Sequence, residues 1–336
     1  MPLRIAKAAV LAALVLLPAL TGWIAVECAA PAPGPGGSVF FEVQKGGSVR
    51  AVAASLEKQK IVRSALALTL YYNLYESRAR LKAGEYEFVF PANAKAVLAK
   101  IVKGRVYLRP VTIPEGLTGD EIAELLRART AADAGAFRTA FRERARVAAW
   151  DDGAANLEGY LFPDTYLMPR KATAGDFVEA MAAQFRKVFG EAWRRRAADL
   201  GLSVREVVIL ASLIEKETAV PGERPLVSAV FHNRLRIGMK LDCDPTVIYG
   251  LKLEDKYSGR LLSRDLKFAS PYNTYIRAGL PPGPICNPGR ASLEAALYPA
   301  SNDYLYFVAQ GDGSHRFSRT LGEHLRAVES YHLKKS

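Results

Sequence analysis

The stretch Ala211-Ser-Leu-Ile-Glu-Lys-Glu-Thr-Ala219 places two carboxylates at the end of a strongly apolar run. The preceding Glu206-Val-Val-Ile-Leu210 continues into it without a break, which predicts one helix. Side chains three and four residues apart are neighbours on a helix, so Glu217 lies over the apolar stripe, whereas Glu215 lies about 200° away. Apolar surroundings disfavour the charged form of an acid and raise its pKa. Glu217 is therefore the candidate proton donor, and the alternative is a solvated helix end with a charged tip.

The N-terminal segment predicts a membrane anchor. Residues 5–26 are almost wholly apolar, and about 20 such residues suffice to cross the hydrocarbon core of a bilayer. Arg4 and Lys7 come at its start and no Lys or Arg follows until Lys45, so the positive-inside rule places the N-terminus in the cytoplasm. We therefore expect residues 1–27 to form a cytoplasmic N-terminus and a single transmembrane helix, with the rest exported. The alternative is a cleaved signal peptide that ends near Cys28-Ala-Ala30.

The chain beyond this segment has the composition of a globular protein. Residues 28–37 are rich in Pro and Gly and predict a linker that does not pack. The roughly 300 residues that follow are long enough for about two domains. The net charge of +12 favours anionic partners such as membrane headgroups or acidic polymers. Export argues against nucleic acid as that partner, and a generally basic surface is the alternative explanation.

Short strands and helices alternate in the first exported part, which predicts an α+β fold class. Residues 38–112 contain a strand, two helices and a second strand, an order that resembles a LysM-type glycan-binding module. Residues 113–155 predict a mostly helical connecting segment. Residues 156–336 predict a mainly helical catalytic domain, in which residues 304–308 and 315–318 form a β-hairpin.

Several classes of catalytic site lack their motifs in this sequence. The three cysteines, Cys28, Cys243 and Cys286, form no CxxC pair, and the four histidines show no metal-ligand spacing. There is no P-loop, no GxGxxG and no GxSxG motif, so nucleotide binding and a nucleophile-elbow hydrolase have no support. Ser314-His315 lies in the predicted hairpin turn and is not expected to be a nucleophile pair. We therefore expect neither a metal nor a cofactor.

Several longer motifs occur in a fixed order along the chain. They are Lys82-Ala-Gly-Glu-Tyr86, Leu157-Glu-Gly-Tyr-Leu-Phe-Pro-Asp-Thr165, Glu215-Lys-Glu-Thr218, Phe231-His-Asn-Arg-Leu235, Asp244-Pro-Thr-Val-Ile-Tyr-Gly250, Tyr272-Asn-Thr-Tyr275, Gly279-Leu-Pro-Pro-Gly283 and Tyr304-Leu-Tyr-Phe-Val-Ala309. Together with the single N-terminal anchor, they make the chain resemble the endolytic murein transglycosylase family, also called MltG or YceG-like. The resemblance covers nearly the whole chain.

The resemblance implies a bacterial inner-membrane enzyme with one membrane pass, a cytoplasmic N-terminus and a periplasmic, extracytoplasmic catalytic domain. It implies cleavage between N-acetylmuramic acid and N-acetylglucosamine within peptidoglycan glycan strands, which leaves a 1,6-anhydro-N-acetylmuramic acid end. It also implies a role in terminating nascent strands, with peptidoglycan synthases as partners. In this family the essential acid is the second glutamate of the Glu-Lys-Glu-Thr motif. That residue is Glu217 here, the same one that helix geometry selects.

One well-placed acid suffices for a lytic transglycosylase, whereas ordinary glycosidases use two carboxylates. In the implied reaction, Glu217 protonates the glycosidic oxygen, and its conjugate base accepts the proton of the sugar's own 6-hydroxyl, which attacks C1. Because that nucleophile belongs to the substrate, no second acid need stand opposite Glu217. Asp244 and Glu158 are the candidates if a separate base is needed.

The other motif residues carry amide, phenol and carboxyl groups that suit hydrogen bonding to a glycan or stacking on its sugar rings. The expected substrate-binding residues are Asn233, Asp244, Tyr249, Tyr272, Asn273 and Tyr275. A structural role is the alternative for each. Cys243 and Cys286 lie in motifs that should converge on one cleft in an oxidising compartment, so we expect a disulfide between them. The alternative is two buried small residues.

Two other classes of function remain open at this point. A non-catalytic peptidoglycan-binding scaffold needs no working acid. A hydrolytic muramidase needs a second carboxylate about 5–10 Å from Glu217, and its products carry reducing ends.

Overall fold

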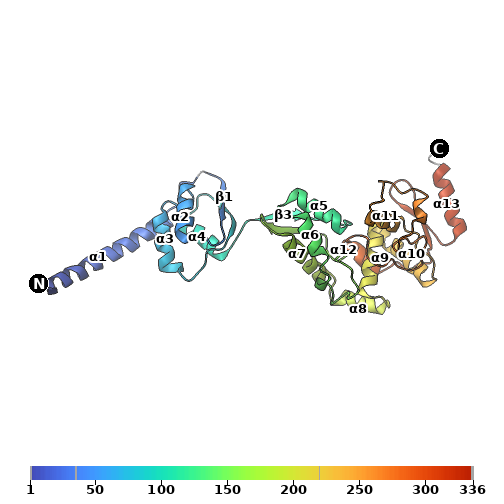
Figure 1. Cartoon of the computed structure of the whole chain (residues 1–336), viewed down its shortest axis with the longest axis horizontal. Helices are drawn as coiled ribbons and strands as arrows, with labels where there is room; N and C mark the ends of the chain where they lie inside the picture. Colours follow the sequence, from blue (N-terminus) through green and yellow to red (C-terminus); the bar gives the residue numbers. More distant parts are fainter. Residues whose placement is uncertain (1, 35, 219, 334–336) are drawn as a thin grey trace. The chain divides into compact units, whose positions relative to one another are not determined.

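The computed structural model describes residues 2–34, 36–218 and 220–333, and its helices and small antiparallel sheets confirm the α+β fold class (Figure 1). The chain divides into two compact units. Unit 1 comprises Met1–Pro110 and Leu167–Lys171, and unit 2 comprises Val111–Tyr166 and Ala172–Ser336. Residues 113–155, predicted to form a helical connecting segment, lie in unit 2.

Unit 1 contains one small sheet and its covering helices. β1 (Ser38–Val43) pairs antiparallel with β2 (Gly84–Val89), so that Ser38 lies opposite Val89. The other elements are α1 (Pro2–Ala29), α2 (Val49–Lys58), α3 (Ala65–Tyr71), a π-helical turn (Tyr72–Glu76) and α4 (Ala94–Lys103). The predicted order of strand, two helices and strand is therefore present, while the likeness to a LysM module stays a prediction.

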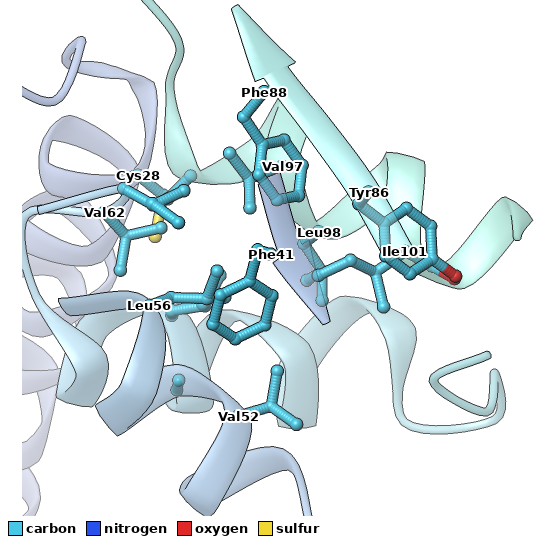
Figure 2. Packing of buried hydrophobic residues seen from close by; sticks show 14 of the residues in the cluster. Cys28, Phe41, Val52, Leu56, Val62, Tyr86, Phe88, Val97, Leu98 and Ile101 are labelled. Atoms are coloured by element: carbon cyan, nitrogen blue, oxygen red, sulfur yellow. The ribbon is translucent and has the colours of Figure 1, made fainter. Parts of the chain in front are cut away.

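The core of unit 1 is formed by apolar side chains from both strands and from the helices (Figure 2). Phe41 from β1 and Tyr86 and Phe88 from β2 meet Leu56 of α2 and Leu98 of α4, and none of the five is more than 4% exposed. The alternation of side chains along a strand places Phe41 and the aromatic pair on one face. Burial of each such side chain contributes about 1.5–3 kcal/mol of stability.

α1 covers the predicted membrane anchor, and its last turns belong to the core of unit 1. Ile24 and Cys28 are 1% and 0% exposed there, whereas Leu14 and Leu17 on earlier turns are 66% and 61% exposed. Among the residues that the structure describes, no helix combines the length and the hydropathy needed to cross a membrane. The transmembrane anchor therefore stays a prediction.

The prediction of an unpacked linker over residues 28–37 is wrong for its first part. Pro31 forms an antiparallel bridge with Asn93, and the backbone N–H of Ala32 donates to the carbonyl of Ala92 at 2.8 Å. Ala32 is only 5% exposed. Proline favours extended backbone in itself and in the residue before it, and an extended segment can pair with a neighbouring one as a strand does. Pro35 lies outside the described residues.

Unit 2 is mainly helical. β3 (Leu108–Thr112) pairs with β4 (Thr165–Pro169), and the boundary between the two units runs through this pair. The helices are α5 (Gly119–Arg129), α6 (Ala134–Phe141), α7 (Ala174–Val188), α8 (Glu191–Asp199), α9 (Val204–Glu217), α10 (Arg224–Arg236), α11 (Asp244–Leu253), α12 (Arg290–Leu297) and α13 (Leu321–Leu333). Short 3₁₀ turns lie at Arg144–Arg146, Pro221–Glu223 and Asp265–Lys267.

The predicted β-hairpin is confirmed in unit 2. β5 (Tyr306–Ala309) and β6 (His315–Ser318) pair antiparallel, with Phe307 opposite Phe317. The hairpin packs against α10 and α13.

α9 is the helix around which this part of unit 2 is built. A capping box starts it, in which Ser203 accepts from the Glu206 N–H and the Glu206 carboxylate accepts from the Ser203 N–H. Every residue from Val207 to Ile214 is buried, and the helix packs against α8, α10, α11 and α12. The predicted single helix through Glu217 is confirmed.

Truncation of a core leucine should destabilise unit 1 while truncation of a surface leucine should not. Leu56→Ala removes a side chain that is 0% exposed, and the cavity should cost about 2–5 kcal/mol of unfolding free energy. Leu66→Ala is the matched control, because Leu66 of α3 is 63% exposed and its loss should change stability by less than about 0.5 kcal/mol. Hydrogen exchange of the α2 and α4 amides measures both effects. Equal protection in the two variants would contradict the core described here.

Candidate active site

Glu217 is the last residue of α9, and its side chain is partly buried. Burial is the main cause that raises its pKa, to about 7. Hydrogen bonding from the Cys243 thiol and the positive charges of His315 and Arg234 lower this pKa, while the negative charge of Asp244 raises it. The residue as a whole is partly exposed, but the pKa responds to the surroundings of the carboxyl group itself. An acid with this pKa can both donate and accept a proton near neutral pH.

The start of α11 supplies two neighbours of Glu217. Cys243 is the N-cap residue of α11, and Asp244 is its first residue. The hydroxyl of Tyr275 donates to Asp244 Oδ1 at 2.6 Å, and the Cys243 N–H donates to Thr274 Oγ1 at 2.9 Å. Burial and then the bond to Asp244 raise the pKa of Tyr275, so its phenol stays protonated at neutral pH. The structure thus joins the motifs 244–250 and 272–275 beside the acid.

The hairpin supplies a group that sequence analysis missed. His315 is the first residue of β6, as predicted for the hairpin, but no role in the site was expected for its side chain. Its Nδ1 lies 2.7 Å from Glu223 Oε2, and its backbone N–H donates to Glu223 Oε1 at 2.8 Å. The two residues are 92 positions apart, and the Gly-rich turn already accounted for the sequence around His315. No pattern in the sequence linked them.

Two residues of the Phe231-His-Asn-Arg-Leu235 motif hold the backbone around the site. The Asn233 amide donates to the carbonyls of Asn302 and Tyr304 at 2.9 and 3.0 Å. Arg234 donates to the carbonyls of Leu305 and Leu241 at 2.6 and 2.9 Å. Both side chains are buried, so these bonds fix the chain that leads into β5 and the chain that leads into α11.

Asn273 is likewise bonded within the protein. Its amide nitrogen donates to the carbonyls of Leu266 and Phe268 at 3.0 and 2.9 Å, and its amide oxygen accepts from the Tyr275 N–H at 2.9 Å. The residue is 0% exposed. Both asparagines thus have bonds within the protein, and substrate binding stays a prediction for them as it does for Asp244 and Tyr275.

Another acid, Glu158, is buried, and its carboxyl lies at the N-terminus of α5. Its carboxyl accepts from the Gly119 N–H at 3.1 Å, from the Asn287 amide at 2.9 Å and from the Tyr249 hydroxyl at 3.2 Å. Burial raises the pKa of Glu158 to about 8, and the bonds from Gly119 and Tyr249 lower it in part. The rings of Tyr249 and Tyr272 are 4.9 Å apart, so both tyrosines belong to the surroundings of Glu158. Their role in substrate binding stays a prediction.

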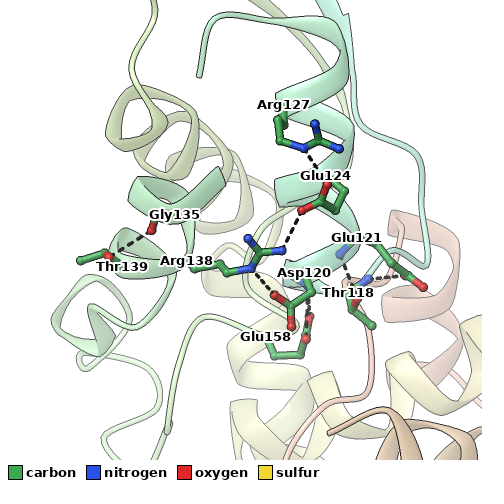
Figure 3. A network of polar contacts seen from close by, with 10 residues as sticks. Thr118, Asp120, Glu121, Glu124, Arg127, Gly135, Arg138, Thr139 and Glu158 are labelled. Atoms are coloured by element: carbon green, nitrogen blue, oxygen red, sulfur yellow. Dashed lines mark hydrogen bonds and ion pairs between the residues drawn. The ribbon is translucent and has the colours of Figure 1, made fainter. Parts of the chain in front are cut away.

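A pocket of about 660 Å³ opens beside Glu158. Charged and polar side chains line most of it, and Arg138 bridges Asp120 and Glu124 at 2.8 Å each at this end of α5 (Figure 3). Groups of this kind suit a ligand that carries hydroxyl and amide groups. Of the two candidate bases, however, Asp244 is the one whose charge acts on Glu217.

The predicted disulfide between Cys243 and Cys286 is wrong. All three cysteines are buried free thiols. The Cys243 thiol is directed to Glu217, whereas Cys286 Sγ donates to the carbonyl of Ser212 at 3.4 Å. The two motifs do pack against α9, but at different places along it. The alternative of two buried small residues describes them.

The carboxylate of Glu215 is hydrogen-bonded to the neighbouring loop. Its Oε2 accepts from the Gly289 N–H at 3.0 Å, and Arg224 lies 4.0 Å from its Oε1. The role of Glu217 as the catalytic acid stays a prediction. Within the described ranges, no group of three or more His, Cys, Asp or Glu side chains is arranged to hold a metal ion.

The sequence profile of the YceG-like family matches residues 41–330, which include the helix, the hairpin and both buried acids. This chain belongs to the YceG-like family. The family predicted from the motifs is therefore confirmed.

Individual members of the family resemble the chain over most of its length. The endolytic murein transglycosylase of Bacillus subtilis is 34% identical over 324 residues, covering 89% of this chain and 86% of that protein. The endolytic murein transglycosylase of Streptococcus pneumoniae D39 is 29% identical over 322 residues, and the match spans 58% of its length. A 2.6 Å crystal structure described as a YceG-like protein of Listeria monocytogenes has a TM-score of 0.58 and 32% identity, covering 86% of this chain and 98% of that one.

The stability of this YceG-like protein should depend on pH through Glu217. Because its pKa is raised from 4.5 to about 7, the native state keeps a proton that the unfolded state has lost between those values. The stability from this group is complete below pH 4.5 and is lost as the pH rises through about 7. Between about pH 5 and pH 8, the Tm of wild type should therefore fall further than the Tm of Glu217→Gln. Glu158 titrates in both proteins, so the difference isolates Glu217, and parallel curves would contradict the raised pKa.

Proposed function

We propose that this chain is an endolytic murein transglycosylase that cuts the bond between N-acetylmuramic acid and N-acetylglucosamine within glycan strands. The observation that carries the proposal is the partly buried carboxyl of Glu217 at the end of α9, with its pKa raised to about 7, in a chain of the YceG-like family. The Bacillus and Streptococcus relatives bear the name of this activity. The product is a 1,6-anhydro-N-acetylmuramic acid end.

Glu217 carries both proton transfers in the proposed reaction. Its carboxylic acid protonates the glycosidic oxygen as the C1–O bond breaks, and positive charge develops at C1 of the muramic acid. The resulting carboxylate accepts the proton of the 6-hydroxyl as that oxygen bonds to C1. Attack within one sugar is favoured by its high effective concentration. The acid is regenerated, and no water is consumed.

Asp244 has a defined part in this reaction. Its negative charge favours the protonated form of Glu217, which is the form that begins the reaction. The same charge can stabilise the cationic centre that develops at C1. Its bond from Tyr275 at 2.6 Å fixes where that charge lies.

A hydrolytic muramidase is the second candidate, and the same Asp244 favours it. A carboxylate close enough to act on Glu217 could activate water, which would replace the 6-hydroxyl as nucleophile. The two reactions differ in mass, because hydrolysis adds a water to each cut and the transglycosylase reaction does not.

The cellular part of the proposal rests on α1 and on the family. We assign α1 as a single-pass anchor in the inner membrane, with the N-terminus in the cytoplasm and the rest of the chain outside. The exposed apolar side chains on its turns, such as Leu14 and Leu17, suit lipid better than water. From that position the enzyme would terminate nascent strands beside the peptidoglycan synthases.

Mass spectrometry of products from purified glycan strands tests the proposed reaction. Wild type should give ends one water lighter than hydrolytic ends, and Glu217→Gln should lower the rate by at least about a hundredfold, because it cannot donate the proton. Glu294→Gln on the exposed side of α12 is the control and should keep full activity.

Each other result has a definite meaning. Hydrated reducing ends would mean that the chain is a hydrolytic muramidase and not a transglycosylase. Cleavage that persists in Glu217→Gln would remove the assignment of the acid. If wild type does not cut the strands even when a synthase is added, the chain is a non-catalytic scaffold.

A further inference from the structure

His315 is held in one orientation by Glu223, which ends the 3₁₀ turn between α9 and α10. Glu223 accepts from the His315 N–H at 2.8 Å and contacts Nδ1 at 2.7 Å, and both side chains are nearly buried, at 11% and 12% exposure. Burial raises the pKa of Glu223, but the bonds from His315 outweigh it, so the net shift is downward. An ionised carboxylate can only accept, which places a proton on Nδ1.

Glu223 also ties His315 to the end of the acid's helix. The hydroxyl of Thr218, the residue directly after Glu217, donates to Glu223 Oε2 at 3.3 Å. A chain of hydrogen bonds therefore runs from the end of α9 through Glu223 to the first residue of β6. It couples the position of the hairpin to the position of Glu217.

The imidazole ring is further confined by two aromatic residues of the hairpin. The Phe307 ring meets it edge-on at 5.4 Å, and the Phe317 ring lies 6.4 Å away. A ring held on Nδ1 and by two neighbours keeps little rotational freedom. Within the described part of the chain, Nε2 has no hydrogen-bond partner, although the charge of this ring acts on Glu217. The bonds through Glu223 to Thr218 thus hold the ring, with this unpartnered nitrogen, near the end of α9.

We propose that His315 binds a hydroxyl group of the glycan beside Glu217 through its Nε2 atom. This rests on the proposed function, because it takes the glycan as the ligand of the site. With Nδ1 committed to Glu223, Nε2 is an acceptor in the neutral ring and a donor in the protonated ring. A sugar hydroxyl both donates and accepts, so it matches either form. A carboxylate only accepts, so it would match only the protonated ring.

The alternative is that His315 has only a structural role, in which the contact between Nδ1 and Glu223 holds the hairpin in place. Two substitutions separate the roles. The amide nitrogen of Asn is as many bonds from Cα as Nδ1 is, so His315→Asn can keep the bond to Glu223 and loses Nε2. The amide nitrogen of Gln is as many bonds from Cα as Nε2 is, so His315→Gln can keep the bond to the glycan.

Binding of purified glycan strands is measured by calorimetry in a Glu217→Gln background, in which strands bind without being cut. His315→Asn should weaken binding about tenfold relative to His315→Gln, as expected for one lost hydrogen bond. His324→Gln is the control, since His324 of α13 stacks on Tyr306 at 5.3 Å and should leave the affinity unchanged. Thermal unfolding of each variant reports the structural role separately.

The outcomes distinguish this inference from the proposed function. Equal affinity of the Asn and Gln variants, or weaker binding by the Gln variant, would overturn the inference that His315 binds the glycan. His315 would then have only a structural role. Failure of the Glu217→Gln parent to bind strands, together with no cleavage by wild type, would overturn both.

Discussion

The site depends on one constraint, which is that α9 stays buried almost to its end and then terminates in a carboxylic acid. Val207 to Ile214 are all inside the protein, so the helix delivers Glu217 to a place where ionisation is costly. The groups around the carboxyl set how costly it is. Burial and Asp244 favour the protonated form, while Cys243, His315 and Arg234 favour the ionised one. The balance near pH 7 is what a group needs to act first as acid and then as base.

The surroundings of Glu217 come from parts of unit 2 that are distant in sequence, and backbone bonds hold each of them. Arg234 and Asn233 hold the chain before α11 and before β5. Asn273 holds the loop that carries Tyr275. A site held by buried side chains that bond to the backbone is preorganised, which is how a protein stabilises developing charge without rearranging. Several polar residues that resemble ligands are therefore the frame of the site.

Features set by local spacing could be predicted from the sequence, and features set by long-range packing could not. The apolar period ending at Glu217 and the turn before His315 determined α9 and the hairpin. The Glu223–His315 pair joins residues 92 positions apart that share no pattern. The sequence predicted that the motifs containing Cys243 and Cys286 lie close together. It could not show in which direction each thiol points. Pro31 and Ala32 were predicted to lie in a linker, because composition does not show that Asn93 lies opposite Pro31.

Direct titration of Glu217 tests the central claim most closely. Infrared difference spectra between wild type and Glu217→Gln, recorded across pH in the intact protein, isolate the carbonyl band of this one carboxylic acid. The account predicts a protonated band that is present at about pH 6 and disappears with a midpoint near 7. A midpoint near 4.5, the ordinary value for a solvated glutamate, would contradict it.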